Sequence, residues 1–118
     1  MGISVYVDGS GGPNSGYGYF VKETGESFYE KKPDMTNNQA EYMAIISALS
    51  RYVGSNEEIT IYSDSKNTVN QLNHEFAINN EQLRSLAQEA WSIMGQFSNL
   101  SIKWVPRKEN LAGKMLGS

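Results

Sequence analysis

The chain has 118 residues, of which 39% are hydrophobic and 19% are charged, and this balance is ordinary for a globular protein. It contains no cysteine, which excludes a disulfide framework and a thiolate metal site, so a metal ion would need oxygen ligands or the single histidine, His74. The net charge of −3 argues mildly against a nucleic-acid partner held by bulk charge, although an acidic site that binds divalent cations reverses its local sign.

The sequence also limits the setting in which the chain works. No run approaches the roughly 18 apolar residues of a membrane span, and the N-terminus lacks the charged-then-apolar layout of a signal peptide. We therefore expect one domain over residues 1–118, in a cytoplasmic protein that has no membrane contact and is a monomer.

The first predicted element is a strand that ends on a carboxylate. Over residues 3–8, apolar and polar side chains alternate with the two-residue period of a strand, and Asp8 comes last. The glycines that begin at Gly9 are predicted to end this strand and to turn the chain. Residues 59–65 repeat the design, with Asp64 in the matching place. Because ligands bind outside the carboxyl ends of strands in open α/β sheets, two strands that both end in Asp predict one acidic site.

A hairpin and a helix are predicted between these two strands. The aromatic-rich runs 16–22 and 26–31 flank a short glycine turn and predict an antiparallel hairpin. The polar loop 33–38 can cap a helix that is predicted over 39–53. Glu41 is the only charged member of the apolar stripe on this helix. A carboxylate there is an exposed first-turn residue favoured by the helix dipole, lies just outside the core, or faces a positive group.

The second half of the chain alternates helices and a strand. A short helix over 66–73, a longer helix over 81–97, a strand over 100–105 and final helical turns over 111–116 are predicted, joined by the loops 73–80 and 107–110. The element order is then β-β-β-α-β-α-α-β-α. Three meander strands followed by βαβ units predict an α/β fold with a mixed sheet and helices on its faces.

Three acids from separate elements, Asp8, Glu41 and Asp64, are expected near the same end of the sheet. Taken singly, each Asp has a structural alternative as a turn residue or a helix cap. Together, three close carboxylates raise one another's pKa values unless a cation is bound, and carboxylates plus water are the ligand set of Mg²⁺ or Mn²⁺. Two such ions about 4 Å apart can activate a water and stabilise the leaving oxygen in phosphodiester hydrolysis.

Three blocks of the sequence resemble the signature blocks of ribonuclease H type 1. They are Tyr6-Val7-Asp8-Gly9-Ser10, Thr36-Asn37-Asn38-Gln39-Ala40-Glu41-Tyr42 and Tyr62-Ser63-Asp64-Ser65-Lys66. Their order, spacing and element types are similar to those of that family over essentially the whole chain. The resemblance implies a ribonuclease H-like fold with a five-stranded mixed sheet in the order 3-2-1-4-5, flanked by helices. It also implies an endonuclease that cleaves the RNA strand of RNA/DNA hybrids with two Mg²⁺ ions, for which Mn²⁺ is a possible substitute, leaving 5′-phosphate ends.

The resemblance assigns metal-binding roles to the three acids. Asp8 would bridge both metal ions, and Glu41 and Asp64 would hold the ion beside the leaving 3′-oxygen.

The same resemblance points to substrate contacts. Thr36 matches a residue that contacts a DNA phosphate, and Asn37 and Asn38 match residues that reach the minor groove. The backbone from Gly9 to Gly12, which includes Gly11, lies with Ser10 where 2′-hydroxyl groups would be recognised. These roles suit a hybrid, because its wide minor groove displays 2′-hydroxyl groups on one strand only. Helix capping is an alternative role for residues 36–38, and the two roles are compatible.

The match fails at the fourth carboxylate of the family, which begins the last helix in a pattern like Asn-x-x-Ala-Asp-x-Leu-Ala. Counting without a gap puts Lys114 in the place of that Asp, and a one-residue deletion puts Gly113 there. A larger deletion lets the amide oxygen of Asn110 act as the fourth ligand, and we favour this over Glu109 and over no ligand at all. Because an amide oxygen is neutral, metal affinity is expected to fall and activity to drop or to shift toward Mn²⁺.

Two other features of the family are missing. The loop 105–110 lacks the usual histidine, although Arg107 or Lys108 could contact a phosphate there, and the loop 73–80 lacks a basic helical handle. His74 is predicted to be a surface loop residue. The eroded fourth position and the absent loop histidine motivate an alternative function, a hybrid- or RNA-binding module of the same fold that is catalytically weak or inactive. Cleavage of duplex DNA is a further alternative, since the fold also hosts DNA nucleases and integrases.

Overall fold

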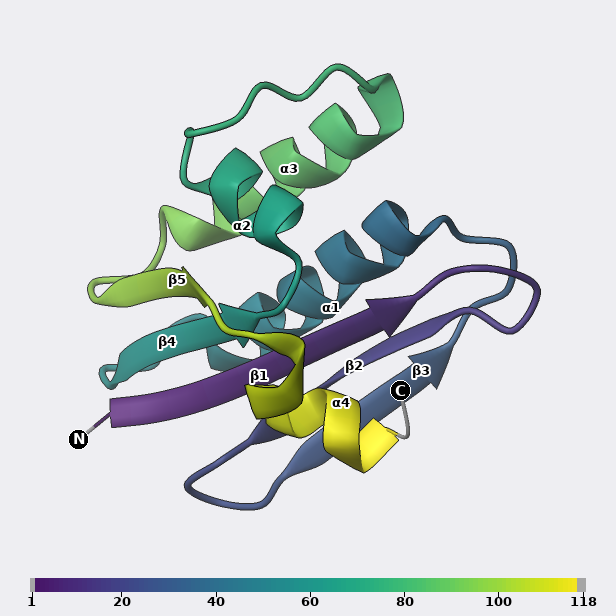
Figure 1. Cartoon of the computed structure of the whole chain (residues 1–118). Helices are drawn as coiled ribbons and strands as arrows, with labels where there is room; N and C mark the ends of the chain where they lie inside the picture. Colours follow the sequence, from purple (N-terminus) through teal and green to yellow (C-terminus); the bar gives the residue numbers. More distant parts are fainter. Residues whose placement is uncertain (1, 117–118) are drawn as a thin grey trace.

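The computed structural model describes the backbone of residues 2–116 and the side chains of residues 2–113. Its strands and helices follow one another in the predicted order (Figure 1). They are β1 (Gly2–Ser10), β2 (Gly16–Val21), β3 (Ser27–Lys31), α1 (Asn37–Tyr52), β4 (Glu58–Ser63), α2 (Lys66–Leu72), α3 (Glu81–Met94), β5 (Leu100–Trp104), the 3-10 turn η1 (Arg107–Glu109) and α4 (Leu111–Leu116).

The five strands form one mixed sheet in the order β3-β2-β1-β4-β5, which confirms the expected α/β architecture. Strand β1 is antiparallel to β2 and parallel to β4, and β4 is parallel to β5. Tight turns can join antiparallel neighbours, whereas parallel neighbours need crossovers, and α1 to α3 provide them. The carboxyl ends of β1, β4 and β5 therefore meet at one edge of the sheet.

The predicted alternation along β1 and β4 is confirmed by side chains on neighbouring strands. Tyr6 pairs with Tyr62, and the two rings stack with centroids 4.9 Å apart. The prediction that Gly9 ends the strand is wrong, because β1 continues to Ser10. Pairing with β2 extends it, since Gly9 lies opposite Tyr17 and Ser10 opposite Gly16.

The main core lies between the sheet and α1, which passes behind the strands in Figure 1. The predicted stripe of α1 is buried throughout, including Ala44, Ile45 and Leu49, and meets Val5 and Val7 in one apolar cluster. Helix α3 packs on α1, and the short α4 lies in front of the sheet against β1 and β2. Burial of the stripe carries the acidic residue at its start toward the sheet.

The helix boundaries differ from the predicted ones by a few residues. Helix α1 starts at Asn37, two residues early, because Thr36 forms a capping box with Gln39. Helix α3 ends at Met94 instead of residue 97, since the N–H groups of Gln96 and Phe97 turn to carbonyls three residues back.

Two hydrogen bonds tie the helices together around α2. The Tyr42 hydroxyl donates to Gln71 Oε1 at 2.7 Å, which links α1 to α2. The Trp91 indole N–H donates to the Leu72 carbonyl at 3.0 Å, which links α3 to α2. Within residues 2–116, no helix has the length and apolar character that crossing a membrane would require.

Candidate metal centre

Three carboxylates converge at the carboxyl-end edge of the sheet. Asp8 comes from β1, Glu41 from the first turns of α1 and Asp64 from the residue that follows β4. Each offers one oxygen, and these oxygens all lie within 4.8 Å of one another. Asp8 and Glu41 are only 5% and 7% exposed, and Asp64 is half-buried. The sequence predicted that these acids lie near one another, and the structure brings them together.

A glycine in β1 makes this convergence possible. A Cβ on Gly9 would lie 2.4 Å from the backbone of Ala40, which is closer than atoms can approach. Only glycine therefore lets β1 pass so near the start of α1. The Gly9 N–H then donates to Glu41 Oε1 at 2.7 Å, which fixes the glutamate carboxylate beside Asp8.

The buried carboxylates of this cluster repel one another when no cation is bound. Burial, reinforced by the neighbouring charges of Asp8 and Asp64, raises the pKa of Glu41 to about 8. The Gly9 N–H and Arg107 lower that pKa, but only in part. Three oxygen donors that repel one another and lie within a few ångströms are a suitable set for Mg²⁺ or Mn²⁺. The residues present therefore fit the divalent cation that the sequence predicted.

Asn110 contacts the cluster through its amide nitrogen. The side chain is fully buried, and Nδ2 donates to Asp64 Oδ2 at 2.9 Å and to the Val7 carbonyl at 2.8 Å. Its oxygen Oδ1 accepts the N–H of Ala112 at 3.0 Å, at the start of α4. The sequence predicted that this oxygen is a metal ligand, and the structure shows it bound to a backbone N–H.

The other residues considered for the fourth place lie differently. Glu109 is exposed on η1 and is not part of the acidic group. Gly113 is buried in α4 and has no side chain. Lys114 belongs to α4, and its side chain lies outside the described residues.

The acids line a cleft of about 320 Å³. Four of the residues predicted to contact substrate line it with them: Gly9, Ser10, Asn37 and Asn38. Of the other two, Thr36 caps α1, while Gly11 donates its N–H to Asn37 Oδ1 at 2.6 Å. The glycine-rich end of β1 and the start of α1 thus form one wall of the cleft. Asp64, Ser65 and Arg107 form the rest.

One contact at the rim was not predicted from the sequence. The Trp104 indole N–H donates to the Asp64 carbonyl at 3.2 Å, and the Lys66 ammonium lies 5.2 Å from the centre of the same ring. A cation over an aromatic face is attracted by the ring quadrupole. Trp104 is 44% exposed, so this pair lies at the surface, next to Asp64 and Ser65, which line the cleft. No local signal could have found it, since 38 positions separate Lys66 from Trp104.

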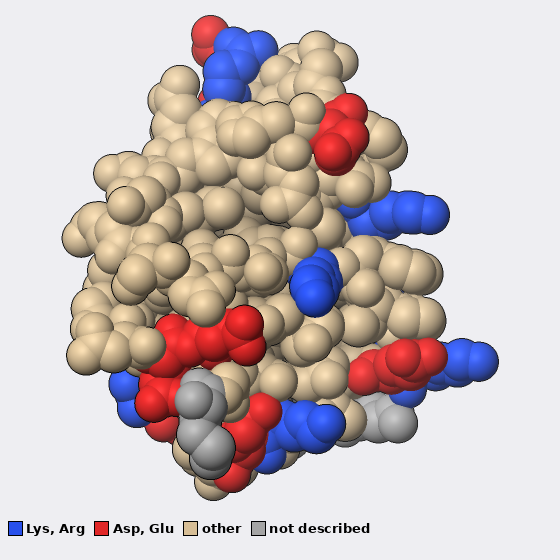
Figure 2. Space-filling view, turned by 90° about the vertical axis from the view of Figure 1, so that its left-hand side faces the viewer, with Lys and Arg blue, Asp and Glu red and all other residues tan. Residues whose placement is uncertain are grey.

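Charge elsewhere on the surface is mixed. On the face shown in Figure 2, Lys and Arg side chains lie singly among acidic and uncharged residues and do not merge into a basic area. This agrees with the net charge of −3. Nucleic-acid binding on this face would have no broad electrostatic attraction to rely on.

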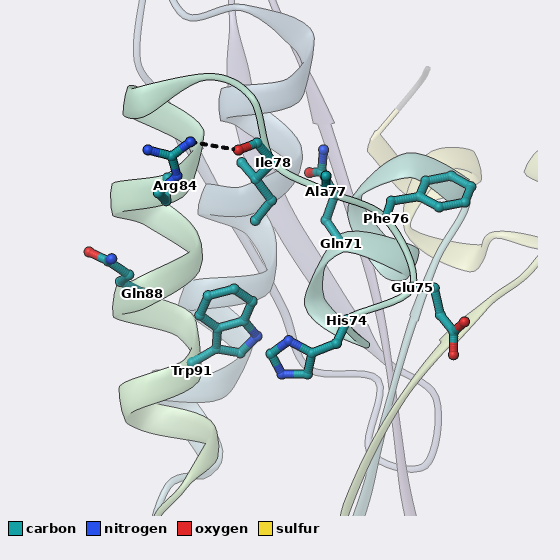
Figure 3. Close-up of a pocket in the computed structure, with 9 residues that line it drawn as sticks. All are labelled: Gln71, His74, Glu75, Phe76, Ala77, Ile78, Arg84, Gln88 and Trp91. Atoms are coloured by element: carbon teal, nitrogen blue, oxygen red, sulfur yellow. Dashed lines mark hydrogen bonds between the residues drawn. The ribbon is translucent and has the colours of Figure 1, made fainter.

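A second cleft, of about 380 Å³, lies between α3 and the loop after α2 and shares no lining residue with the acidic one (Figure 3). His74 lines it and stacks on Trp91 with ring centres 4.7 Å apart, while Arg84 donates to the Ile78 carbonyl at 2.9 Å. His74 is exposed in a loop, as predicted. A cleft without clustered acids does not compete as a metal site.

The sequence of this chain is similar to those of known proteins. The model of the family described as reverse transcriptase-like matches residues 23–117. A ribonuclease H of Syntrophomonas wolfei is 40% identical over 75 residues, which cover 59% of this chain and 51% of that protein. The protein EbsB of Enterococcus faecalis, which is named as a hydrolase without a stated substrate, is 25% identical over 122 residues, covering 97% of this chain and 90% of that protein.

Solved structures match over nearly the whole chain. Ribonuclease H1 from the halophilic archaeon Halobacterium salinarum is 27% identical with a TM-score of 0.87, and the match covers 98% of this chain and 94% of that one. A ribonuclease H1 in complex with an RNA/DNA hybrid is 24% identical with a TM-score of 0.84, covering 97% and 92% of the two chains. The second likeness, at that identity, concerns the fold.

Proposed function

Because this chain belongs to the ribonuclease H type 1 family, we propose that it is a metal-dependent endonuclease that hydrolyses the RNA strand of RNA/DNA hybrids. The observation that carries the proposal is the convergence of Asp8, Glu41 and Asp64, whose oxygens lie within 4.8 Å of one another. A relative of this fold has been solved with a hybrid bound, which supports the same class of substrate here.

In this proposal, Asp8, Glu41 and Asp64 hold two Mg²⁺ ions, for which Mn²⁺ can substitute. Bound there, these ions supply the Lewis acidity with which water is activated and the leaving 3′-oxygen is stabilised, giving 5′-phosphate products. The protein contributes by holding the three carboxylates in a preorganised arrangement. The Gly9 N–H holds one oxygen of Glu41, and Asn110 holds one oxygen of Asp64.

The wall of the cleft suits the minor groove of a hybrid. Gly9 and Ser10 are small, and Asn37 and Asn38 place exposed amides beside them, so a wide groove with 2′-hydroxyl groups can approach closely. Thr36 lies at the same helix start and is proposed to contact a DNA phosphate. Strand preference then comes from the 2′-hydroxyl groups, which only the RNA strand carries.

Basic groups near the acids are proposed to bind the substrate phosphates. Arg107 lines the cleft and lowers the pKa of Glu41, so its guanidinium acts on the same space as the carboxylates. Lys66 is held at the rim by Trp104. Each such phosphate contact makes binding weaken as salt rises, because counterions are released on binding.

A binding module of the same fold, with weak or no catalysis, is the second candidate. The contacts of Asn110 favour it, since its oxygen is bound to Ala112 and the described part of the chain offers no fourth carboxylate to the acidic group. In that case the hybrid would bind in the same cleft without being cut.

The test uses an end-labelled RNA/DNA hybrid incubated with Mg²⁺, with Mn²⁺ and with EDTA. We expect cutting of the RNA strand alone, only with metal, and a loss of about a thousandfold or more in Asp8→Asn, since several kcal/mol of transition-state stabilisation is removed. Asp34→Asn is the matched control, because it removes the same charge from an exposed loop residue.

Three outcomes separate the candidates. Hybrid binding without cutting in either metal, by a folded protein, would favour the binding module. Cleavage of plain duplex DNA would point to a DNA nuclease of the same fold. Equal cutting by the parent chain and Asp8→Asn would remove the acidic cluster from the mechanism.

A further inference from the structure

The buried amide of Asn110 has all of its hydrogen-bonding groups engaged. The two N–H groups on Nδ2 donate to the Val7 carbonyl at 2.8 Å and to Asp64 Oδ2 at 2.9 Å. The oxygen accepts from Ala112 N at 3.0 Å. An amide has two donor hydrogens and one acceptor oxygen, so this set leaves no donor hydrogen over.

The chemistry of the partners fixes which way this amide faces. Val7 offers a carbonyl and Asp64 a carboxylate, and both are acceptors, while Ala112 offers a donor. Exchanging the amide nitrogen and oxygen would place three acceptors together and two N–H groups face to face. In a fully buried position, such a loss of partners is costly. The oxygen therefore cannot turn toward the acids without breaking all three contacts.

These contacts join three parts of the chain that are distant in sequence. Val7 precedes Asp8 in β1, Asp64 follows β4, and Ala112 lies in the first turn of α4. One oxygen of Asp64 accepts a hydrogen bond from Asn110, which fixes the direction of a carboxylate that belongs to the acidic group. Hydrogen bonds to ligating carboxylates orient the ligand, and their removal typically lowers metal affinity by about 10- to 100-fold.

We infer that Asn110 is a positioning residue that fixes the carboxylate of Asp64 through its amide N–H and is not itself a cation ligand. This inference rests on the proposed function, since it requires that Asp64 binds a metal ion. It replaces the prediction that the Asn110 oxygen takes the place of the missing carboxylate. Asn110 then does not act as the family's fourth ligand. It supports a neighbouring ligand, Asp64, instead.

The test is a double-mutant cycle read out by calorimetric titration with Mn²⁺ in the absence of nucleic acid. Asn110→Ser keeps an oxygen that can cap α4 but loses the amide donors. We expect it to weaken Mn²⁺ binding by about tenfold or more in the parent chain. In the Asp64→Ala background, where the carboxylate is gone, the same change is expected to cost almost nothing further. Asn73→Ser is the control, because its Nδ2 also donates to a strand carbonyl, that of Ile102 at 3.0 Å.

The outcomes distinguish this inference from the proposed function. If the losses from Asn110→Ser and Asp64→Ala add, Asn110 binds the cation directly and the inference is overturned. If Asn110→Ser binds Mn²⁺ as the parent does, positioning is overturned as well. Absence of Mn²⁺ binding by the folded parent chain would overturn the proposed metal site, and the inference with it.

A second measurement needs no variant and covers the case in which Asn110→Ser fails to fold. The side-chain N–H₂ resonances of Asn110 are followed by NMR in the parent chain before and after saturation with Mg²⁺. We expect slow solvent exchange of these protons in both states, because Val7 and Asp64 still accept them. Loss of that protection on adding Mg²⁺ would mean that the amide turns its oxygen to the ion, which contradicts the inference.

Discussion

The starts of α1 and α4 lie beside the same acids but differ in whether an asparagine caps the helix. At α1, Thr36 Oγ1 accepts the N–H of Gln39, so no asparagine is needed as the cap. Asn37 and Asn38 line the cleft instead, and Asn37 Oδ1 accepts the Gly11 N–H. At α4, Asn110 itself accepts the helix N–H, so its nitrogen must face the acids. The comparison teaches that the residue which caps a helix decides what the neighbouring side chains can offer to a site.

The largest expected effect comes from breaking the approach of β1 to the start of α1. Gly9→Ala would place a Cβ 2.4 Å from the Ala40 backbone, which cannot move without shifting the helix. We expect the free energy of unfolding to fall by about 3 kcal/mol and Mn²⁺ affinity to fall at least about tenfold, measured by denaturation and calorimetry. Gly95→Ala is the control, since its Cβ would meet only ordinary contacts from 3.6 Å outward. Normal metal binding by Gly9→Ala would show that this close approach is not required.

The second prediction concerns the pH dependence that the buried Glu41 creates. Its pKa rises from 4.5 to about 8, so between these values the folded chain keeps a proton that the unfolded chain releases. Stability in EDTA is therefore expected to fall as pH rises through this window, and Glu41→Gln is expected to flatten the dependence. Thermal denaturation from about pH 5 to about pH 9 measures it.

Metal binding should release the same proton from Glu41. At neutral pH, Mn²⁺ must displace it from Glu41, so calorimetry in buffers of different ionisation enthalpy is expected to show proton release that vanishes near pH 9. The account would be contradicted if the stability of the parent chain in EDTA rose steadily with pH between the pKa values of Glu41 in the unfolded and folded states.

A smaller effect is expected at the exposed asparagines of α1. Asn38→Ala removes one neutral hydrogen-bonding group from the cleft, so hybrid affinity should fall about fivefold, or about 1 kcal/mol, while Mn²⁺ affinity is unchanged. Asn99→Ala, at an exposed position before β5, is the matched control. A loss of Mn²⁺ affinity in Asn38→Ala would mean that the two helix starts do not differ as described.

The smallest effect is expected from the cap of α1 itself. Gln39→Ala removes the return hydrogen bond from Thr36 N and an exposed hydrogen bond to Gln82 Oε1, and we expect about 0.5 kcal/mol of stability to be lost in urea denaturation, with Mn²⁺ affinity unchanged. Asn110→Ser, by contrast, is expected to lower metal affinity. Equal losses of Mn²⁺ affinity in Gln39→Ala and Asn110→Ser would contradict the view that only the cap of α4 also orients a metal ligand.

Much of this molecule could be predicted because its patterns are local. Two-residue alternation gave the strands that carry Asp8 and Asp64, and the helical stripe that includes Glu41 gave α1 its buried face. The start of α1 was misplaced by two residues, because Asn37 and Asn38 belong to a residue type that favours caps and turns and were assigned to the polar loop.

The orientation of Asn110 could not be predicted, and the reason is physical. It depends on the carbonyl of Val7, 103 positions away, and on the side chain of Asp64, 46 positions away. A family pattern marks where a ligand is missing but carries no information on which atom of a replacement faces the site. The Trp104 contact to the Asp64 carbonyl escaped for the same reason.

The most direct test is to find where a cation binds and what holds it. Crystals soaked in Mn²⁺ allow the ion to be located by its anomalous scattering. The account predicts density in the cleft, coordinated by carboxylate oxygens of Asp8, Glu41 and Asp64, with Asn110 Oδ1 still accepting from Ala112. Mn²⁺ bound to the Asn110 oxygen, or no Mn²⁺ between the three acids, would contradict it.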